Sequence, residues 1–92
     1  MEIDFDPAKN ESNIRERGLS FERVGDFRWD EAIVGEDTRK PYPERRYVAV
    51  GYLDGRLHVL CFAETERGIR IISLRKANKR EARNYEKTFT AD

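Results

Sequence analysis

The sequence predicts a single α+β domain, with a small antiparallel sheet of three to four strands flanked by two N-terminal helices and one C-terminal helix. Helix start and stop signals in the first third, period-two alternation around an Asp-Gly pair, and a basic closing segment predict this class. Ninety-two residues fit one domain and leave no room for a second core. The chain is 38% hydrophobic and 39% charged, which is typical of a folded protein with an ionic surface.

Capping residues predict two helices near the N-terminus. Asp6-Pro7 is a typical N-cap followed by a proline at the first helical position, and Gly18 is a typical stop, so we expect a helix over about 7–17. Ser20 then caps a second, short helix that carries the apolar residues of 21–27.

A β-hairpin is the clearest element of the sequence. Residues 47–53 and 56–63 alternate in the strand manner and are joined by Asp54-Gly55, which favours a two-residue turn that pairs Leu53 with Arg56. One face is apolar and is expected to pack under the helices: Val48, Val50, Tyr52, Leu57, Val59 and Cys61. The other face combines small residues with basic and aromatic ones and is expected to form an open groove: Arg45, Tyr47, Ala49, Gly51, His58, Leu60 and Phe62.

An isoleucine-rich strand over 68–74 and a helix over about 77–89 complete the expected fold. The strand is expected to pair antiparallel with its predecessor through a turn at residues 66–68. One side of the helix should pack through Asn78, Ala82, Tyr85 and Phe89. The opposite side is a basic stripe of Lys76, Arg80, Arg83 and Lys87.

Charge is unevenly distributed although eighteen basic and eighteen acidic residues cancel. The segment 67–87 is strongly basic, which indicates a surface for phosphate backbones, although a solvated face is an equally good interpretation. The lone Cys61 cannot form an internal disulfide and is expected to be a buried thiol in a reducing compartment. No apolar run is long enough for a membrane span and no signal peptide is evident, so we expect a cytoplasmic protein without a membrane partner.

Arginine and lysine are the residues that could carry chemistry, because the sequence shows no metal-ligand spacing and no cofactor motif. RNA cleavage through the ribose 2′-hydroxyl needs no cofactor, but it needs positive groups that stabilise the phosphate. Arg70 and Arg75 border an apolar strand and are the first candidates. Strict alternation would place them on opposite faces unless the strand ends or bulges near Leu74. The alternative is that each arginine pairs with an acidic neighbour.

His58 is the conventional candidate for proton transfer because its ordinary pKa lies near neutrality. A bystander role for this lone strand histidine is the more common outcome. Tyr85 could donate a proton, and Phe27 and Trp29 could stack on bases, but core packing is the favoured interpretation of all three.

Several blocks together resemble the BrnT toxin family. They are Phe5-Asp6-Pro7-Ala8-Lys9 with Asn13, Gly18-Leu19-Ser20-Phe21, Arg46 with Gly51, Asp54-Gly55-Arg56, and Arg70-Ile71-Ile72-Ser73-Leu74-Arg75-Lys76-Ala77 with Glu81 and Tyr85. The resemblance implies a RelE-like fold and a ribonuclease that arrests translation. It also implies a BrnA-type antitoxin that binds the toxin and joins it in repressing their operon, so that operator DNA is bound through the complex.

The resemblance also implies which residues belong to the site. Positions matching polar positions of the family pattern are Lys9, Arg46, Arg56, Arg70, Arg75 and Lys76. The chain differs from many members at Arg17, where they have histidine, and at Ala63-Glu64-Thr65, where they have a threonine followed two residues later by arginine.

Two hypotheses follow. The first is a metal-independent endoribonuclease with catalytic candidates Lys9, Arg46, His58, Arg70 and Arg75. In this hypothesis the RNA backbone is held by Arg56, Lys76, Lys79, Arg80 and Arg83. The second is a non-catalytic module whose basic helix binds a partner protein and supports DNA-bound repression.

Overall fold

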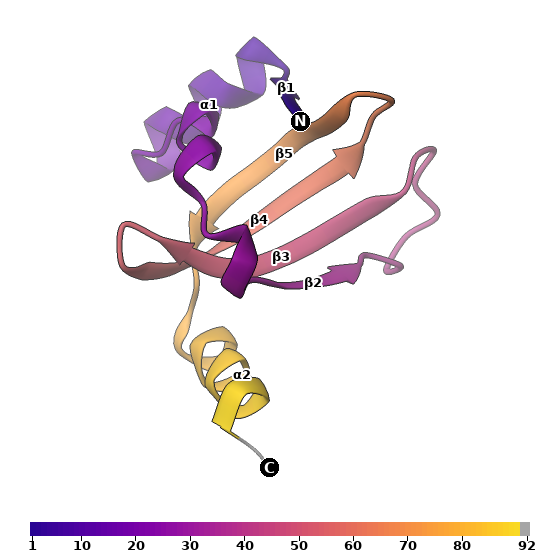
Figure 1. The fold of residues 1–92 in the computed structure, drawn as a ribbon. Helices are drawn as coiled ribbons and strands as arrows, with labels where there is room; N and C mark the ends of the chain where they lie inside the picture. Colours follow the sequence, from indigo (N-terminus) through magenta and orange to yellow (C-terminus); the bar gives the residue numbers. More distant parts are fainter. Residues whose placement is uncertain (91–92) are drawn as a thin grey trace.

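The computed structural model describes residues 1–90, in which one twisted sheet carries helices on both sides (Figure 1). The elements in chain order are β1 (Glu2–Phe5), α1 (Pro7–Arg17), the 3₁₀ helices η1 (Phe21–Asp26) and η2 (Trp29–Glu31), β2 (Ile33–Glu36), β3 (Arg46–Leu53), β4 (Arg56–Glu64), β5 (Gly68–Lys76) and α2 (Lys79–Thr90). The spatial order of the strands is β1-β5-β4-β3-β2.

The α+β class is confirmed, but the predicted sheet was too small and of the wrong kind. Over residues 1–90 the sheet has five strands, and β1 pairs with β5 in parallel, so the sheet is mixed. Both additional strands, β1 and β2, are edge strands of four residues. Four residues are too few to show a clear alternation, which is why the sequence pattern missed them.

The predicted caps of the N-terminal helices are confirmed. The Asp6 carboxylate accepts a hydrogen bond from the backbone N–H of Ala8, and Gly18 ends α1 in the left-handed region with φ 67°. The Ser20 hydroxyl accepts from the backbone N–H of Glu22 and so begins η1. The second helix is a 3₁₀ helix, not an α-helix, and η2 follows it as a further short turn.

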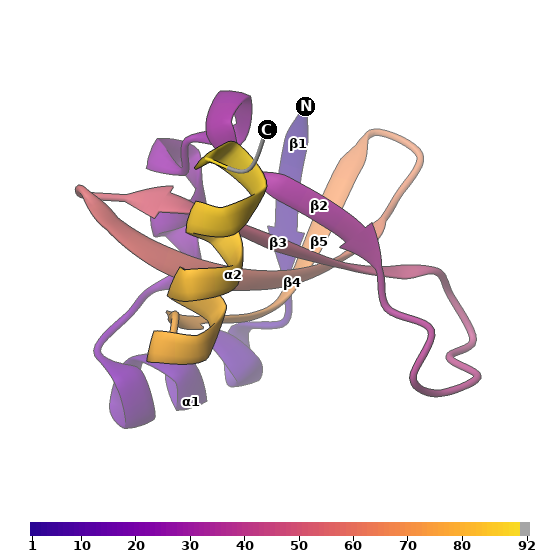
Figure 2. The same cartoon turned by 90° about the horizontal axis from the view of Figure 1, so that it is seen from below.

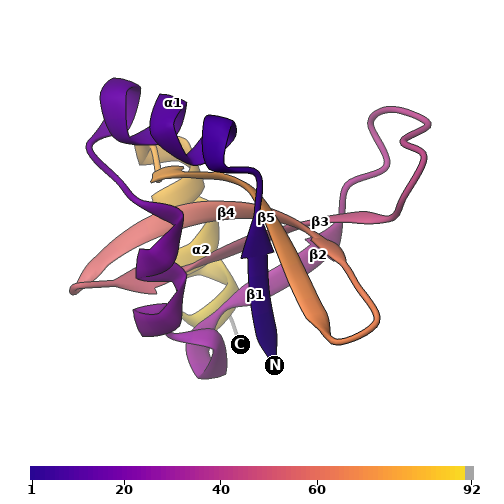
Figure 3. The ribbon, with the colours of Figure 1, turned by 90° about the horizontal axis from the view of Figure 1, so that it is seen from above.

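Helix α1 is held to the sheet mainly by a buried amide. Asn13 is 7% exposed, and its Nδ2 donates 2.9 Å hydrogen bonds to the carbonyl oxygens of Leu19 and Leu74, whereas the helix's large apolar residue Ile14 is 39% exposed. Figure 3 shows α1 beside the end of β5, beyond the part of that strand that pairs with β1. The Asn13 side chain thus joins α1 to the backbone of β5 through a buried hydrogen bond.

The hairpin and its register are confirmed residue by residue. Leu53 pairs with Arg56, Gly51 with His58, Ala49 with Leu60 and Tyr47 with Phe62. Asp54 and Gly55 adopt φ of 53° and 76°, as a primed two-residue turn requires. The third predicted strand is also confirmed and continues two residues further, to Lys76.

The predicted assignment of the hairpin faces was wrong. The face expected to form an open groove holds the core, because Ala49 and Leu60 are fully buried and Phe62 is 6% exposed against η1 and η2. Small residues here make room for an aromatic ring: a Cβ on Gly51 would lie 2.8 Å from Cζ of Phe27. The core cluster consists of Phe21, Val24, Phe27, Ala49, Leu53, Leu60, Phe62, Ile69, Ile71 and Leu74.

The opposite face, expected to be buried throughout, is covered only in part. Val59 is buried, but Val48, Val50 and Tyr52 are half-buried, and the Cys61 thiol is half-buried where a buried one was expected. Helix α2 covers the end of this face nearest the hairpin turn and leaves the other end open (Figure 2). The sequence could not distinguish the two faces because both are largely apolar.

Helix α2 contacts the sheet through few side chains. Tyr85 is 6% exposed, packs edge-on against Tyr52 and donates a 2.5 Å hydrogen bond to the carbonyl oxygen of Glu31. Phe89 was expected to pack but is 59% exposed. The core interpretation of Tyr85, Phe27 and Trp29 is confirmed. Among the helices of residues 1–90, none is long and apolar enough to cross a membrane.

Candidate functional site

A β-bulge in β5 brings Arg70 and Arg75 to the same face of the sheet. Cys61 pairs with Ser73 while the next residue, Phe62, pairs with Ile71, so Ile72 is an extra residue on β5. Because one extra residue inverts the alternation beyond it, two arginines five residues apart point the same way. The condition stated from the sequence, that the strand must end or bulge near Leu74, is therefore met by a bulge.

Arg46 lies on this face as well. It pairs with Ala63 on β4, and Ala63 pairs with Arg70 on β5, so the three residues form a row across three strands. Ala63 is 1% exposed and too small to separate the two arginines. We call the open surface formed by Arg46, Cys61, Arg70, Ser73 and Arg75 the arginine face.

Carboxylates from outside the sheet contact these arginines. Glu44, just before β3, accepts a 2.8 Å hydrogen bond from Nη2 of Arg70 through its Oε1, and the same oxygen lies 3.4 Å from Nε of Arg46. Arg46 Nε is buried and has no hydrogen-bond partner. The predicted alternative, pairing with an acidic neighbour, is thus confirmed for Arg70, and one glutamate serves two arginines.

Arg75 is held in a two-pronged contact by α2. Its Nη1 and Nη2 donate to the two carboxylate oxygens of Glu81 at 2.8 and 2.7 Å. Hydrogen bonding from Arg75 lowers the pKa of Glu81 to about 2, and hydrogen bonding to Glu81 raises the pKa of Arg75. Glu81 also accepts from the backbone N–H of Asn78, whose side chain in turn accepts from the backbone N–H of Glu81, so this pair caps α2.

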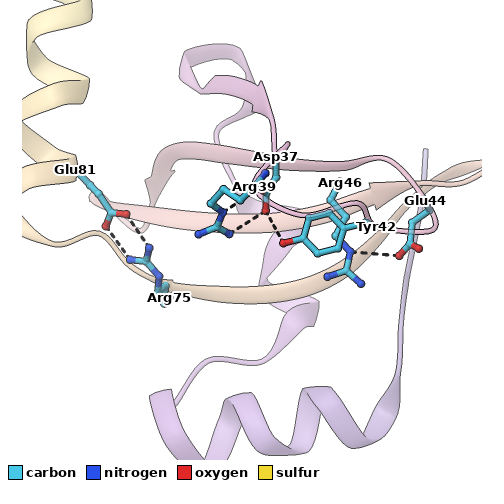
Figure 4. A network of polar contacts seen from close by, with 7 residues as sticks. All are labelled: Asp37, Arg39, Tyr42, Glu44, Arg46, Arg75 and Glu81. Carbon is cyan, nitrogen blue, oxygen red and sulfur yellow. Dashed lines mark hydrogen bonds and ion pairs between the residues drawn. The ribbon is translucent and has the colours of Figure 1, made fainter.

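The segment between β2 and β3 folds over the arginine face and adds a fourth guanidinium (Figure 4). Asp37 accepts from Nε and Nη2 of Arg39 at 2.9 Å and from the Tyr42 hydroxyl at 3.2 Å. These hydrogen bonds, led by Arg39, hold the pKa of Asp37 well below its usual range. The Arg46 guanidinium lies 4.2 Å above the Tyr42 ring.

The arginine face is therefore only slightly positive. Arg39, Arg46, Arg70 and Arg75 bring four guanidinium groups, and three carboxylates are paired with them in the described part of the chain. The carboxylates are those of Asp37, Glu44 and Glu81. Glu81 raises the pKa of Arg75, and the positive charge of the nearby Arg39 opposes part of this rise.

His58 is not brought to this face. It is 4% exposed, pairs with Gly51 on the core side, and its Nδ1 lies 2.8 Å from the carbonyl oxygen of Arg56. Lys9 is exposed on α1 and lines a cleft of about 440 Å³ with Ile72 and Ser73, so it approaches the arginine face from the β5 side.

The predicted RNA-binding residues form a separate basic area around the start of α2. Arg56 and Lys79 line a shallow cleft of about 320 Å³ between the hairpin turn and α2. Lys76 pairs with His58, on the side of the sheet opposite the arginine face, and Arg80 and Arg83 are exposed on the helix.

Sequence reasoning missed three residues of the site: Arg39, Tyr42 and Glu44. All three lie in the proline-containing segment between β2 and β3, for which the sequence predicted no helix or strand. The available signal was its composition, because charged and aromatic residues concentrated between two strands are typical of a functional loop. Loop residues show no periodicity from which their direction could be predicted.

Residues 5–81 match the family model described as "Ribonuclease toxin, BrnT, of type II toxin-antitoxin system". The match begins at the last residue of β1 and ends in the first turn of α2, so it includes β2 to β5 and the whole arginine face. This chain belongs to the BrnT family. None of the curated proteins compared with it matches.

Membership of the BrnT family gives the general function of this chain. A BrnT protein is a toxin with ribonuclease activity, and a type II system provides a protein antitoxin as its partner. The arginine face, the cleft at Lys9 and the basic area near α2 are the places where this BrnT chain could meet RNA or protein.

Proposed function

We propose that this BrnT chain is a metal-independent endoribonuclease that cleaves RNA at the arginine face and thereby arrests translation. In the proposed reaction the ribose 2′-oxygen attacks the adjacent phosphorus, and guanidinium groups stabilise the negative charge that develops on the phosphate oxygens. Arg46 and Arg70 bind the scissile phosphate from either side of Ala63, and Arg75 binds a neighbouring phosphate.

One observation carries this proposal: the bulge at Ile72 places Arg70 and Arg75 on the same face as Arg46. Without the extra residue, Arg75 would point to the core side. Guanidinium groups are well suited to this role because their planar donors can bind two phosphate oxygens at once. The geometry therefore supports binding of a phosphate diester at this face.

The carboxylates that pair with the arginines do not prevent RNA binding. The Arg70 side chain is 44% exposed and that of Glu44 is 29% exposed, and ion pairs with such exposure contribute about 0–1 kcal/mol. Arg70 contacts Glu44 through Nη2, so its other donors remain available to a phosphate. Lys9 is exposed and lines a cleft with Ser73 of the arginine face, so we propose that it contacts the flanking RNA backbone.

The experiment compares purified protein with two variants on a short labelled RNA in EDTA. The unmodified protein is expected to cleave it and to leave 2′,3′-cyclic phosphate ends. Arg70→Ala should lower the cleavage rate about 10²–10³-fold, the usual effect of removing one donor to a developing oxyanion. Arg28→Ala is the matched control, because Arg28 is also exposed and ion-paired but lies on η2's N-terminal side, away from the arginine face.

Cleavage that survives both Arg70→Ala and the double variant Arg70→Ala/Arg75→Ala would contradict this site. Cleavage that disappears in EDTA would contradict the metal-independent reaction. Growth arrest on expression should be lost in the same variants that lose cleavage.

A second role, as a partner-binding module in an operator-bound complex, is favoured by the exposure of the basic side chains on α2. Arg80 and Arg83 point to solvent. We propose that the antitoxin binds the toxin and that DNA is contacted through the complex. Arg80→Ala/Arg83→Ala should then weaken operator binding by the complex while cleavage by the free toxin persists.

A further inference from the structure

The proposed reaction needs a group that removes the proton from the 2′-hydroxyl, and this inference rests on that proposed function. His58, the conventional candidate, is buried on the opposite side of the sheet. Within residues 1–90, three carboxylates contact guanidinium groups of the arginine face or of the segment above it, namely Asp37, Glu44 and Glu81.

Two of these carboxylates are already saturated with donors. Asp37 receives hydrogen bonds from Arg39 and Tyr42 on its two oxygens, and its side chain is 6% exposed. Glu81 receives Arg75 on both oxygens and the backbone N–H of Asn78 on one of them. A carboxylate whose two oxygens are engaged by strong donors is a poor proton acceptor.

Glu44 differs in its contacts. Arg70 and Arg46 both approach its Oε1, and in the described structure Oε2 has no hydrogen-bond partner. The side chain is 29% exposed, so a bound RNA can reach it. The two arginines fix the carboxylate above Ala63, between the groups proposed to hold the scissile phosphate.

We propose that Glu44 is the general base of the ribonuclease reaction, accepting the 2′-hydroxyl proton on Oε2. The bond between the 2′-oxygen and phosphorus forms as the bond between phosphorus and the 5′-oxygen breaks. The proton from the 2′-hydroxyl moves to Glu44, and the leaving 5′-oxygen takes a proton from solvent. The products are a 2′,3′-cyclic phosphate and a 5′-hydroxyl end.

The test is single-turnover cleavage by Glu44→Gln, which keeps an acceptor oxygen for the arginines but cannot take up the proton. We expect a rate at least about 10²-fold lower, the usual contribution of a general base, with RNA affinity within about threefold of the unmodified protein. Glu66→Gln, which removes an exposed carboxylate at the turn between β4 and β5, is the matched control and should cleave normally.

A second variant gives a readout that a structural role would not produce. Glu44→Ala should be partly restored by added formate, because a small carboxylate can occupy the vacated space and accept the proton. The same formate should not restore Arg70→Ala.

Three outcomes would overturn the assignment: unchanged or faster cleavage by Glu44→Gln, a loss of rate matched by an equal loss of RNA affinity, or no rescue of Glu44→Ala by formate. If Arg70→Ala abolishes cleavage while Glu44→Gln does not, the ribonuclease site stands and this inference fails. If neither variant affects cleavage, the proposed site itself is wrong.

Discussion

At the scale of single residues, the function of each arginine depends on the carboxylate beside it. Glu44 leaves donors of Arg70 free, whereas Glu81 engages both terminal nitrogens of Arg75 and also caps α2. We therefore assign the scissile phosphate to Arg46 and Arg70. Arg75 has a mixed role, because it also ties the C-terminal helix to the sheet.

The pair between Glu81 and Arg75 predicts a dependence of stability on pH. The pKa of Glu81 falls from an ordinary 4.5 to about 2 in the folded protein, so its contribution is full above about pH 4.5 and is lost as the pH falls toward 2. Glu81→Gln should therefore lower the free energy of unfolding at pH 7 by about 1 kcal/mol, a value reduced for the partial exposure of the pair. It should also flatten the decline of stability between pH 4.5 and 2.

Urea unfolding measured across this pH range checks the prediction, with Glu66→Gln as the control. Asp37, whose pKa is also lowered, continues to contribute in the same direction in both variants. If the free energy of unfolding of Glu81→Gln declined across this pH range as steeply as that of the unmodified protein, the ion pair between Glu81 and Arg75 would not persist in solution.

At the scale of elements, the sheet works as two different surfaces. Helices η1 and η2 cover one face, where Phe27 occupies the space left by Gly51. The other face is covered by α2 at one end and left open at the other, and the bulge at Ile72 directs Arg75 to this face, where Glu81 of α2 contacts it. The close packing on the first face is what leaves the second face available for function.

The contact between Gly51 and Phe27 can be tested directly. Gly51→Ala should reduce the free energy of unfolding by about 1–3 kcal/mol, because its Cβ would lie 2.8 Å from the ring and the packed core has little room to shift. Gly35→Ala on the edge strand β2 is the matched control, since a Cβ there meets nothing within 4 Å. Chemical denaturation compares the two, and equal stability would show that Phe27 moves freely.

At the scale of the whole molecule, RNA binding must depend on local charge because the formal net charge is zero. All four guanidinium groups near the arginine face have a carboxylate of their own or share one, so few phosphates are neutralised per complex. Long-range attraction should be weak, and binding should rely on contacts made after RNA arrives.

This charge balance predicts a shallow salt dependence. Two to three phosphate contacts give a slope of about −1.4 to −2.1 for log K against log salt concentration, at about −0.7 per contact with single strands. Arg70→Ala should make the slope smaller in magnitude by about 0.7, while Arg28→Ala leaves it unchanged. Fluorescence anisotropy of a labelled RNA at salt concentrations from about 50 to about 300 mM measures the slope for both variants. A much steeper slope would indicate that the basic area near α2 dominates binding.

Local features were predictable from the sequence because each depends on neighbours along the chain. The caps at Asp6 and Ser20, the stop at Gly18 and the register set by Asp54-Gly55 all follow from side-chain or turn geometry within a few residues. The blocks that resemble the BrnT family also lie within residues 5–81, where the family match is found, with the exception of Tyr85.

Tertiary structure alone decided which face of the hairpin is buried and which carboxylate meets which arginine. Phe27 selects the face by filling the space at Gly51, and Glu44 meets Arg70 across 26 positions of the chain. Such contacts join segments that are distant in sequence, so no local pattern records them. The bulge at Ile72 depends on both levels. The sequence showed that Arg70 and Arg75 can share a face only if the strand ends or bulges, and the pairing of β4 with β5 places the bulge at Ile72.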